Sequence, residues 1–472
     1  VSFLCHAGIG IFPLILFGNE EQRRRFLPGM VSGERIGAFA LTEAEAGSDA
    51  AALRTRAVRA QGRDGYLLTG EKIYCTNAGI ADLFTVFAKT DDDRITAFAV
   101  ERATPGISAG KEEEKMGIHG SSTASLSMEG AFVPSKNVIG EAGGGLKVAY
   151  TVLDAGRMKL AAACVGSGKR LVEAMAIQAK TRRQFGREIA SFELIRQKIA
   201  RSAARVWLAE SLVYRLAGGM GAGPAAVGEL SIEAAIAKVF CSETVAFAAD
   251  EAVALFGGAG FIRGYPPESA YRDCRVDRIF EGTNEICRLY VASALIKRAL
   301  SGKLPLMQRL GEILAGLKGG FAKPDPTSPL AEEASQVESL KRLCVYLAGV
   351  ALKKFGEKIT SRQAILETVA DLAIEACAFD SGVARARGLF GTADEAKFRA
   401  LSDACGASLA ERVPLLVART RQALINTAGG DEAEHAPYMK ALSRLVEERK
   451  FDTDAAWNRV AERVLEDEGL DV

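Results

Sequence analysis

Residues 83–88 read Leu-Phe-Thr-Val-Phe-Ala, and residues 95–100 read Ile-Thr-Ala-Phe-Ala-Val. Asp91, Asp92 and Asp93 lie between these two runs and favour a turn. Short apolar runs that are rich in β-branched and aromatic residues and separated by turn residues are typical of an antiparallel sheet or barrel. Residues 36–41 form a third such run. We therefore predict a β-domain over residues 35–140.

Helical patterns flank the predicted β-domain on both sides. Residues 1–34 have a helical pattern with breaks expected at Pro13 and Gly18. After the β-domain, apolar residues recur at i, i+3, i+4, i+7 and i+8, as in Ile232, Ala235, Ile236, Val239 and Phe240. The long helical segments are expected at 146–180, 190–218, 230–256 and 284–300. Helices of this length with short connections predict a four-helix bundle over residues 141–300.

In the C-terminal third of the chain, we predict a linker followed by more helices. Residues 318–330 are rich in Pro and Gly, and residues 331–472 are again helical in pattern, so we expect a linker or amphipathic segment over 301–330 and an appended helical domain beyond it. One apolar face in the linker consists of Leu304, Leu306, Met307, Leu310, Ile313, Leu314 and Leu317. This face suits a membrane interface or a contact between domains. A β-domain that is preceded and followed by helical segments predicts the α+β class.

Composition excludes several kinds of partner. The 472 residues are 48% hydrophobic and 25% charged, and 60 basic against 59 acidic residues leave a net charge of +1. This balance does not favour nucleic acid, and no apolar run reaches the roughly 18 residues that span a bilayer. The nine cysteines form no Cys-x-x-Cys pair and only three histidines are present, so we expect no metal site and a reducing compartment.

The octet Arg-Ile-Phe-Glu-Gly-Thr-Asn-Glu at residues 278–285 contains the most informative carboxylate. We expect Ile279 and Phe280 to desolvate Glu281 and thereby make it a stronger base. Gly282 would let another molecule approach the backbone. A carboxylate tuned in this way suits proton abstraction next to a carbonyl group. The alternative is a solvated Glu near the positive end of a helix dipole.

Four segments in the same order resemble the acyl-CoA dehydrogenase family over roughly residues 1–300. They are residues 41–49 (LTEAEAGSD), 181–186 (TRRQFG), 256–261 (FGGAGF) with 271–273 (YRD), and the octet at 278–285. Residues 81–90 and the helical C-terminal region resemble the very-long-chain subgroup, in which an added helical domain supports a dimer and peripheral membrane contact. The resemblance also implies that residues 1–34 are the end of the family's N-terminal helical domain, most of which we expect to be missing.

The resemblance implies α,β-dehydrogenation of a long-chain fatty acyl-CoA to the trans-2-enoyl-CoA, as in fatty acid β-oxidation. Glu281 would remove the α-proton, FAD would take the β-hydride, and electrons would pass to electron-transfer flavoprotein. The backbone N–H of Glu281 and a ribityl hydroxyl of the flavin would hydrogen-bond the thioester oxygen, as in an oxyanion hole.

The family's site residues carry over by position. The implied cofactor-binding residues are Thr42, Ser48, Tyr74, Thr76, Arg182, Phe185, Gly257, Gly258, Thr283 and Glu285. The implied substrate-binding residues are Ser48, Asp154, Arg157, Phe280 and Gly282. Simpler readings stay open: strand threonines, a turn serine, a solvated Arg157, and a helix C-cap at the two glycines. Three departures from the family's pattern are Tyr74 for Trp, Ala254 for Gln and Ala44 for Pro.

The resemblance further implies a homo-oligomer, with a dimer favoured. Both the bacterial cytoplasm and the mitochondrial matrix or inner-membrane face fit the composition. Two alternatives remain beside the dehydrogenase: an assembly or scaffold protein that has kept the fold without much turnover, and a related flavin oxidase that uses oxygen directly. A pure scaffold would have no need to keep Glu281, Thr42, Thr76 and Arg157 together.

Overall fold

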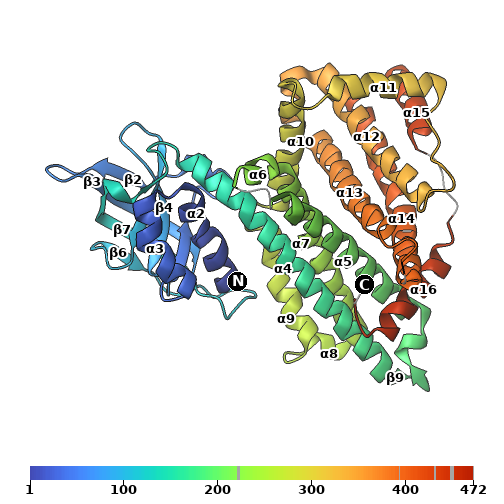
Figure 1. Ribbon diagram of the computed structural model, residues 1–472, viewed down its shortest axis with the longest axis horizontal. Helices are drawn as coiled ribbons and strands as arrows, with labels where there is room; N and C mark the ends of the chain where they lie inside the picture. The colour runs from blue at the N-terminus through green and yellow to red at the C-terminus, as the bar shows by residue number, and fades with distance from the viewer. Residues whose placement is uncertain (221–223, 393, 430–431, 447–450, 471–472) are drawn as a thin grey trace. The chain divides into compact units, whose positions relative to one another are not determined.

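The computed structural model describes residues 1–220, 224–392, 394–429, 432–446 and 451–470. The chain divides into two compact units. The first unit comprises Val1–Leu160 and Met220–Ser231, and the second comprises Ala161–Gly219 and Ile232–Val472. Figure 1 shows the sheet in the first unit and the long helices in the second. An α+β protein with a helical bundle and further C-terminal helices is thus confirmed.

Short helices begin the first unit. They are α1 (Ser2–Cys5), the π-helical turn η1 (His6–Gly10), α2 (Phe12–Phe17) and α3 (Glu20–Ser32). The break predicted at Pro13 lies just before Phe12, where α2 begins. Pro13 itself lies in the first turn of α2, where an N–H would have no helical partner. Gly18 ends α2 as predicted. Asn19 and Gln22 then form a reciprocal capping box that fixes the start of α3.

The sheet of the first unit is mixed. Its strands are β1 (Gly37–Ala40), β2 (Arg56–Arg59), β3 (Gly65–Thr76), β4 (Leu83–Lys89), β5 (Ile95–Glu101), β6 (Ile107–Ala109), β7 (Thr123–Pro134) and β8 (Val138–Ile139). They are ordered β6-β7-β3-β2-β4-β5-β8, with β1 paired to β4. The prediction of an antiparallel sheet or barrel misses two parallel pairs, because β1 and β2 both run parallel to β4. The β2–β3 hairpin intervenes between β1 and β4, which allows the chain to enter both strands in the same direction.

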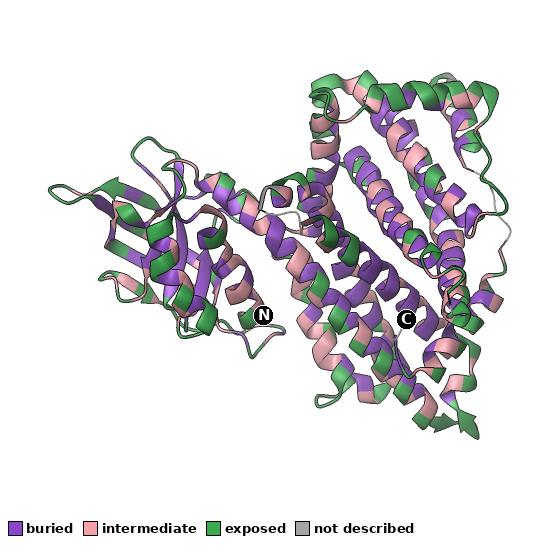
Figure 2. Ribbon diagram, in the orientation of Figure 1, coloured by how far each residue is buried: buried purple, intermediate pink, exposed green. Residues whose placement is uncertain are grey.

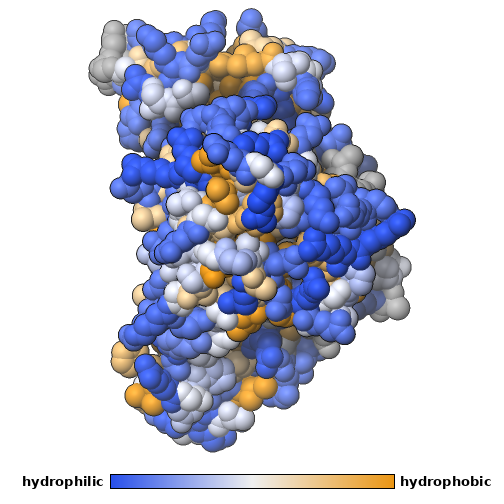
Figure 3. Space-filling model, turned by 90° about the vertical axis from the view of Figure 1, so that its left-hand side faces the viewer, coloured by the Kyte–Doolittle hydropathy of each residue, from blue (hydrophilic) through white to orange (hydrophobic). Residues whose placement is uncertain are grey.

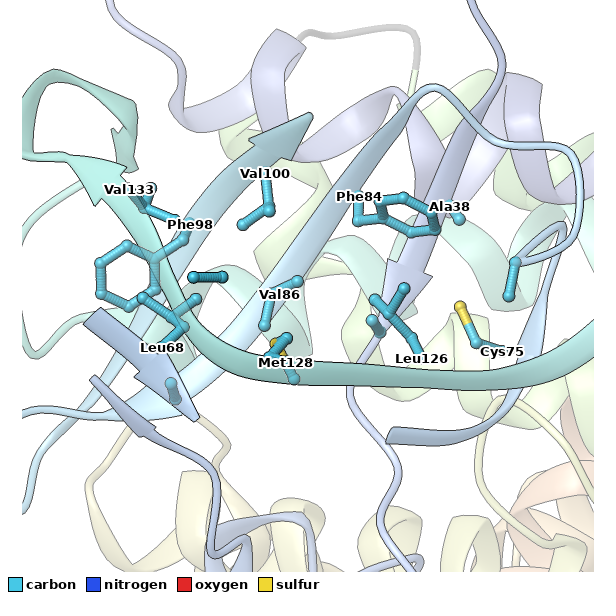
Figure 4. Close-up of a cluster of buried hydrophobic side chains, with 14 of the residues drawn as sticks. Ala38, Leu68, Cys75, Phe84, Val86, Phe98, Val100, Leu126, Met128 and Val133 are labelled. Atoms are coloured by element: carbon cyan, nitrogen blue, oxygen red, sulfur yellow. The ribbon is translucent and has the colours of Figure 1, made fainter. Parts of the chain in front are cut away.

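Both faces of β4 are covered, which explains its unbroken apolar sequence. Phe84 and Val86 point into one buried cluster with Phe98 and Met128, as Figure 4 shows. On the opposite face, Leu83 and Phe87 pack with residues of α2, α3 and the start of α4 (Gly145–Thr181). A strand buried on both faces reads as a continuous hydrophobic run rather than an alternating one.

The predicted four-helix bundle is confirmed. Its helices are α4, α5 (Glu193–Met220), α7 (Ser231–Phe256) and α10 (Asn284–Leu300), within a few residues of the predicted segments. Shorter elements between them are α6 (Pro224–Glu229), α8 (Gly258–Phe261), α9 (Pro266–Asp273) and the hairpin of β9 (Arg183–Gln184) and β10 (Arg187–Glu188). Lys169 of α4 binds Glu210 of α5 at 2.9 Å, and the Arg205 guanidinium of α5 lies 5.1 Å from the ring centroid of Phe247 in α7. Figure 2 shows the buried faces of these helices.

The C-terminal helices belong to the same unit as the bundle. They are α11 (Leu306–Gly319), α12 (Ala331–Phe355), α13 (Gln363–Arg387), α14 (Glu395–Ala428), α15 (Glu432–Leu445) and α16 (Thr453–Glu466). Helix α13 packs on the bundle so closely that a Cβ added to Gly382 would lie 2.4 Å from Leu208 of α5. Arg288 of α10 also binds Asp371 of α13 at 2.7 Å. The appended helices therefore extend the core of the bundle.

The apolar face predicted at 304–317 is largely the face of α11. Leu310 and Ile313 are buried, and Leu310 lies against Gly349 of α12. Met307 and Leu314 are exposed. Of the two roles that the sequence left open for this face, Leu310 and Ile313 therefore fit packing within the chain and not a membrane interface. On the face drawn in Figure 3, hydrophobic residues form small groups among hydrophilic ones.

Among the helices of the described ranges, we find none that combines the length and the apolar character needed to cross a membrane.

Candidate active site

Glu281 lies on a strained loop of the second unit, between the 3-10 turn η5 (Cys274–Arg278) and α10. Its φ is 59°, and that of the following Gly282 is 88°. The left-handed region favours glycine and costs other residues about 1–3 kcal/mol, so it persists only where surrounding contacts hold it. Glycine at position 282 makes the second of these conformations easy. The contacts that hold Glu281 in place are therefore part of the site.

Donors from two helices hold this loop through one carbonyl. The Lys238 ammonium of α7, fully buried at 0% exposure, donates to the Gly282 carbonyl at 2.8 Å and to Asn284 Oδ1 at 2.7 Å. The Cys287 thiol of α10 donates to the same Gly282 carbonyl at 3.5 Å. Thr283 caps α10 by accepting from the Ile286 N–H at 3.3 Å. The loop is thus tied to α7 on one side and to α10 on the other.

Asn284 links the loop to a buried charged network. Its amide donates to Ser242 Oγ and to Glu243 Oε1, both at 3.1 Å. Glu243 also accepts from Arg288 at 2.8 Å. Burial by itself raises the pKa of Glu243, but the Arg288 guanidinium and the Asn284 amide outweigh it and leave that pKa below its usual range.

The two apolar residues before Glu281 are buried to different degrees. Ile279 is 50% exposed, while Oε2 of the Glu281 carboxylate is buried. Ile279 directly follows η5, and Phe280 and Glu281 are half-buried. The solvated carboxylate at the helix start is instead Glu285, which is exposed in the first turn of α10. A hydrogen bond from its own backbone N–H lowers the pKa of Glu285.

Gly257 and Gly258 present bare backbone. Gly257 has φ 62° and separates α7 from α8, and its N–H donates to the Ala254 carbonyl at 3.1 Å. A Cβ added at either glycine would meet no atom within 4 Å. Open space beside an uncovered backbone fits the close approach of another molecule.

Arg182 and Phe185 lie at the β9–β10 hairpin and are exposed. Phe185, at 92% exposure and φ 51°, occupies the turn together with Gly186 at φ 77°. Its ring meets Phe192 edge-on at 5.9 Å. An aromatic ring and a guanidinium on one exposed hairpin can stack on a planar ring and bind a phosphate.

The first unit carries the other cofactor candidates near the ends of β1 and β3. Thr42 follows β1, and its carbonyl accepts from the Ile73 N–H at 2.9 Å. Tyr74 is 64% exposed with φ 53°, where the β3–β7 pairing shifts register between Lys72 and Cys75. Such a bulge re-aims a side chain. Thr76 ends β3 half-buried, and Ser48 is exposed in the loop after Thr42.

A buried ion pair holds the loop of Thr42 and Ser48. Lys72, fully buried on β3, donates to Glu43 Oε1 at 2.7 Å. The Glu43 carboxylate also accepts from the Thr55 hydroxyl at 2.5 Å and from the Arg54 N–H at 2.6 Å. Burial by itself raises the pKa of Glu43, but these donors outweigh it and lower that pKa below its usual range.

Asp154 and Arg157 form a buried pair on α4, with 2.7 Å between Oδ1 and Nη1. Arg157 is 8% exposed, so the reading of a solvated Arg is wrong. The pair fixes the direction of the guanidinium fork.

The structure thus groups the predicted residues in each unit. The second unit has Arg182, Phe185, Gly257, Gly258, Phe280, Glu281, Gly282, Thr283 and Glu285, and the first has Thr42, Ser48, Tyr74, Thr76, Asp154 and Arg157. Sequence reasoning missed Glu43, Lys72, Lys238 and Asn284. A signal existed for Lys238, since it is the only basic residue of the 26-residue α7. Across the described ranges, no group of three or more His, Cys, Asp or Glu side chains is placed to hold a metal ion.

Comparisons with known proteins match four parts of the chain to one family. Family models described as acyl-CoA dehydrogenase N-terminal, middle and C-terminal domains match residues 1–34, 38–131 and 143–296. A second C-terminal domain model of the same family matches residues 339–443. The matched C-terminal segment 143–296 contains Glu281.

Relatives and solved structures agree with these matches. A probable acyl-CoA dehydrogenase of Bacillus subtilis is 42% identical over 400 residues, which cover 82% of this chain and 67% of that protein. The human very long-chain specific mitochondrial acyl-CoA dehydrogenase is 37% identical over 403 residues, which cover 79% of this chain and 61% of that protein. The crystal structure of the Bacillus anthracis acyl-CoA dehydrogenase, complexed with FAD, superposes with a TM-score of 0.96 at 36% identity, covering 100% of this chain and 82% of that one.

A mixed-sheet unit, a helical bundle with a carboxylate on a strained loop, and these relatives together define a flavoprotein oxidoreductase. The chain belongs to the acyl-CoA dehydrogenase family.

Proposed function

We propose that this chain catalyses the FAD-dependent α,β-dehydrogenation of a long-chain fatty acyl-CoA, with Glu281 as the catalytic base. The observation that carries the proposal is the left-handed Glu281, which buried donors hold directly before Gly282. Strain of this kind is retained at functional sites. The family to which the chain belongs supplies the reaction class.

The residues present fit FAD. Gly257 and Gly258 leave open backbone where a cofactor could lie, and Arg182 and Phe185 offer a phosphate partner and a stacking surface. On the first unit, the exposed Tyr74 ring and the hydroxyls of Thr42 and Thr76 suit a planar heterocycle with polar edges. When bound, FAD supplies the acceptor for the hydride.

Glu281 performs the proton step. Its carboxylate takes a proton from the carbon next to the thioester carbonyl, while the β-carbon loses a hydride and a trans C=C bond forms. The backbone N–H of Glu281 is suited to donate to the thioester oxygen as negative charge develops there. Gly282 leaves room for the thioester beside that N–H.

We further infer a homodimer, a long acyl chain and electron-transfer flavoprotein as the electron acceptor. The match to the human very long-chain relative, which extends over 403 residues, supports a long acyl chain in the substrate. The exposed Phe185 supports an oligomer, since a neighbouring subunit or its cofactor could cover that ring. The exposed Met307 and Leu314 of α11 are the side chains available for the membrane contact implied earlier. We infer that the protein works in the bacterial cytoplasm or the mitochondrial matrix, where it would bind acyl-CoA.

The purified chain is expected to be yellow, and its flavin should bleach when palmitoyl-CoA is added without oxygen. Bleaching is expected because hydride transfer reduces the bound flavin and the colour reports it directly. Stopped-flow absorbance with acyl-CoAs of increasing length measures the rate and gives the preferred chain. Long chains should react fastest.

Three outcomes separate the proposal from its alternatives. A yellow protein that bleaches with no acyl-CoA contradicts the dehydrogenase and favours the scaffold. Stoichiometric peroxide from substrate in air identifies the oxidase. Rapid reoxidation by electron-transfer flavoprotein, with little peroxide, supports the dehydrogenase.

A further inference from the structure

Two lysines are among the largest fully buried side chains of the described residues, and each binds a loop that carries site residues. Lys72 binds Glu43 in the first unit, and Lys238 binds the Gly282 carbonyl in the second. An ammonium rarely loses all its water unless hydrogen bonds replace it. Lys238 therefore needs an explanation that a helix core alone does not provide.

Helix α7 gains no packing advantage from Lys238. The residues around it in sequence are Ala237, Val239 and Phe240, all buried, and a leucine or methionine would fill similar space without desolvating a charge. The Lys238 Nζ instead donates to two acceptors on the loop, the Gly282 carbonyl at 2.8 Å and Asn284 Oδ1 at 2.7 Å. The cost of burial is thus offset at the loop.

The Gly282 carbonyl determines how the loop is shaped. The peptide plane that contains it follows directly after the two left-handed residues Glu281 and Gly282. If that plane turned over, Gly282 would change ψ, and Glu281 could relax toward the β or right-handed region that non-glycine residues prefer. Its carboxylate and its N–H would then both move. Lys238 opposes this because the turned carbonyl would leave a buried ammonium with one acceptor fewer.

The remaining donors cannot replace Lys238. Cys287 reaches the same carbonyl at 3.5 Å, but a thiol is a weak donor. Thr283 fixes the first turn of α10 and not the preceding peptide. Ser242 and Glu243 hold the Asn284 side chain and thereby prevent Asn284 from rotating away from Lys238.

From these contacts we propose that Lys238 is a positioning residue for catalysis: it fixes the Gly282 carbonyl and so holds the carboxylate and N–H of Glu281 against the thioester. The proposal rests on the proposed function, since it assigns Lys238 a role in the proton step of that reaction. In this role Lys238 acts through the loop and does not touch the substrate.

The test compares Lys238→Met with the unaltered chain in two assays. The first is the limiting rate of anaerobic flavin reduction by palmitoyl-CoA. The second is exchange of the substrate's α-hydrogens into D2O on protein whose flavin has first been reduced with dithionite. Reduced flavin accepts no hydride, so exchange reports only the transfer of a proton to and from Glu281.

Both rates should fall about 100-fold in Lys238→Met, because displacing a catalytic group by about 1 Å can cost that much. Flavin content and the palmitoyl-CoA concentration for half-saturation should stay within about twofold, since Lys238 touches neither ligand in the proposed site. A purely structural lysine would lower the melting temperature and leave the exchange rate of the folded protein unchanged. That result would overturn the proposal.

Two further variants keep the test decisive. Lys238→Gln keeps an N–H donor for the buried acceptors but ends one bond short of Lys, so it should fold even if Lys238→Met does not and still lose at least about tenfold in exchange. Full exchange in that variant overturns the proposal. Lys169→Met is the matched control, since Lys169 lies in the same unit and its ammonium binds Glu210 of α5 at 2.9 Å. It should exchange at the unaltered rate.

The same assays distinguish a failure of the proposed function from a failure of the role proposed for Lys238. If the unaltered chain neither bleaches nor exchanges, the dehydrogenase itself is wrong. If the unaltered chain does both, Glu281→Gln does neither and Lys238→Met does both at full rate, only the role of Lys238 is wrong.

Discussion

Glu281→Gln is expected to bind FAD normally and to lose flavin reduction by palmitoyl-CoA by about 10³-fold or more, at the upper part of the range for a general base. The amide has nearly the shape of the carboxylate but cannot accept the α-proton. The side chain is half-buried and the strain of residue 281 is in the backbone, so the change leaves the loop intact. Anaerobic stopped-flow absorbance measures the loss.

The matched control is Glu173→Gln, the same chemical change at an exposed position of α4 in the same unit. It should bleach at the unaltered rate. The melting temperature of Glu281→Gln should also remain within a few degrees of the unaltered chain. Full-rate bleaching by Glu281→Gln would falsify its assignment as the base.

Lys72→Met is expected to have the largest effect on stability, with a loss of about 3–5 kcal/mol, because it leaves the buried Glu43 carboxylate without its cation. The pair is 2.7 Å long, with the lysine side chain fully buried and that of Glu43 only 10% exposed. Since Glu43 holds the loop of Thr42 and Ser48, flavin content should fall as well. Urea unfolding and the flavin-to-protein absorbance ratio measure the two effects.

A nearby exposed pair provides the control. Arg54 and Glu45 lie 2.5 Å apart in the same region, but their side chains are 76% and 65% exposed. Removing that pair with Arg54→Met should cost less than about 1 kcal/mol. The double variant Glu43→Gln with Lys72→Met should recover part of the loss, since no charge stays buried alone. Equal effects of Lys72→Met and Arg54→Met would contradict the assignment.

The same carboxylate should make stability depend on acid. Because the pKa of Glu43 is lowered in the folded protein, its contribution is fully present above the unfolded pKa of about 4.3 and is lost as the pH falls through the folded value. Glu43→Gln should therefore be less stable than the unaltered chain at pH 7, and the difference should shrink below about pH 4. Urea unfolding from pH 7 to pH 3 measures this, and a difference that stays constant with pH would count against it.

The long helices could be predicted from the sequence because their apolar periodicity is strong and glycine or proline marks their ends. The two parallel strand pairs could not, since alternation and turn residues say nothing about strand direction. The conformation of Glu281 was hidden for a similar reason: contacts with α7 and α10 impose its positive φ, against the preference of the residue itself.

Charged residues account for most of what the sequence did not reveal at the site. Lysine is usually solvated, so nothing local in the sequence indicates that Lys72 is buried, and for Lys238 the only signal is that α7 has no other basic residue. Their acceptors, Glu43 and the Gly282 carbonyl, are 29 and 44 residues away along the chain. Ile279 shows the opposite case, an apolar residue that the sequence placed inside and the structure leaves half exposed.

The contacts of Arg288 show why removing the C-terminal helices would disturb the rest of the second unit. Its guanidinium binds Glu243 of α7 on one side and Asp371 of α13 on the other, one turn beyond the loop that carries Glu281. Helix α13 also covers Trp207 of α5, which is 1% exposed. A chain cut at residue 330 would uncover an indole ring and unbalance the charges behind the loop that carries Glu281. The boundary between family domains is therefore a poor place for an expression truncation, and a minimal catalytic fragment would need redesign of the Arg288 and Trp207 surfaces.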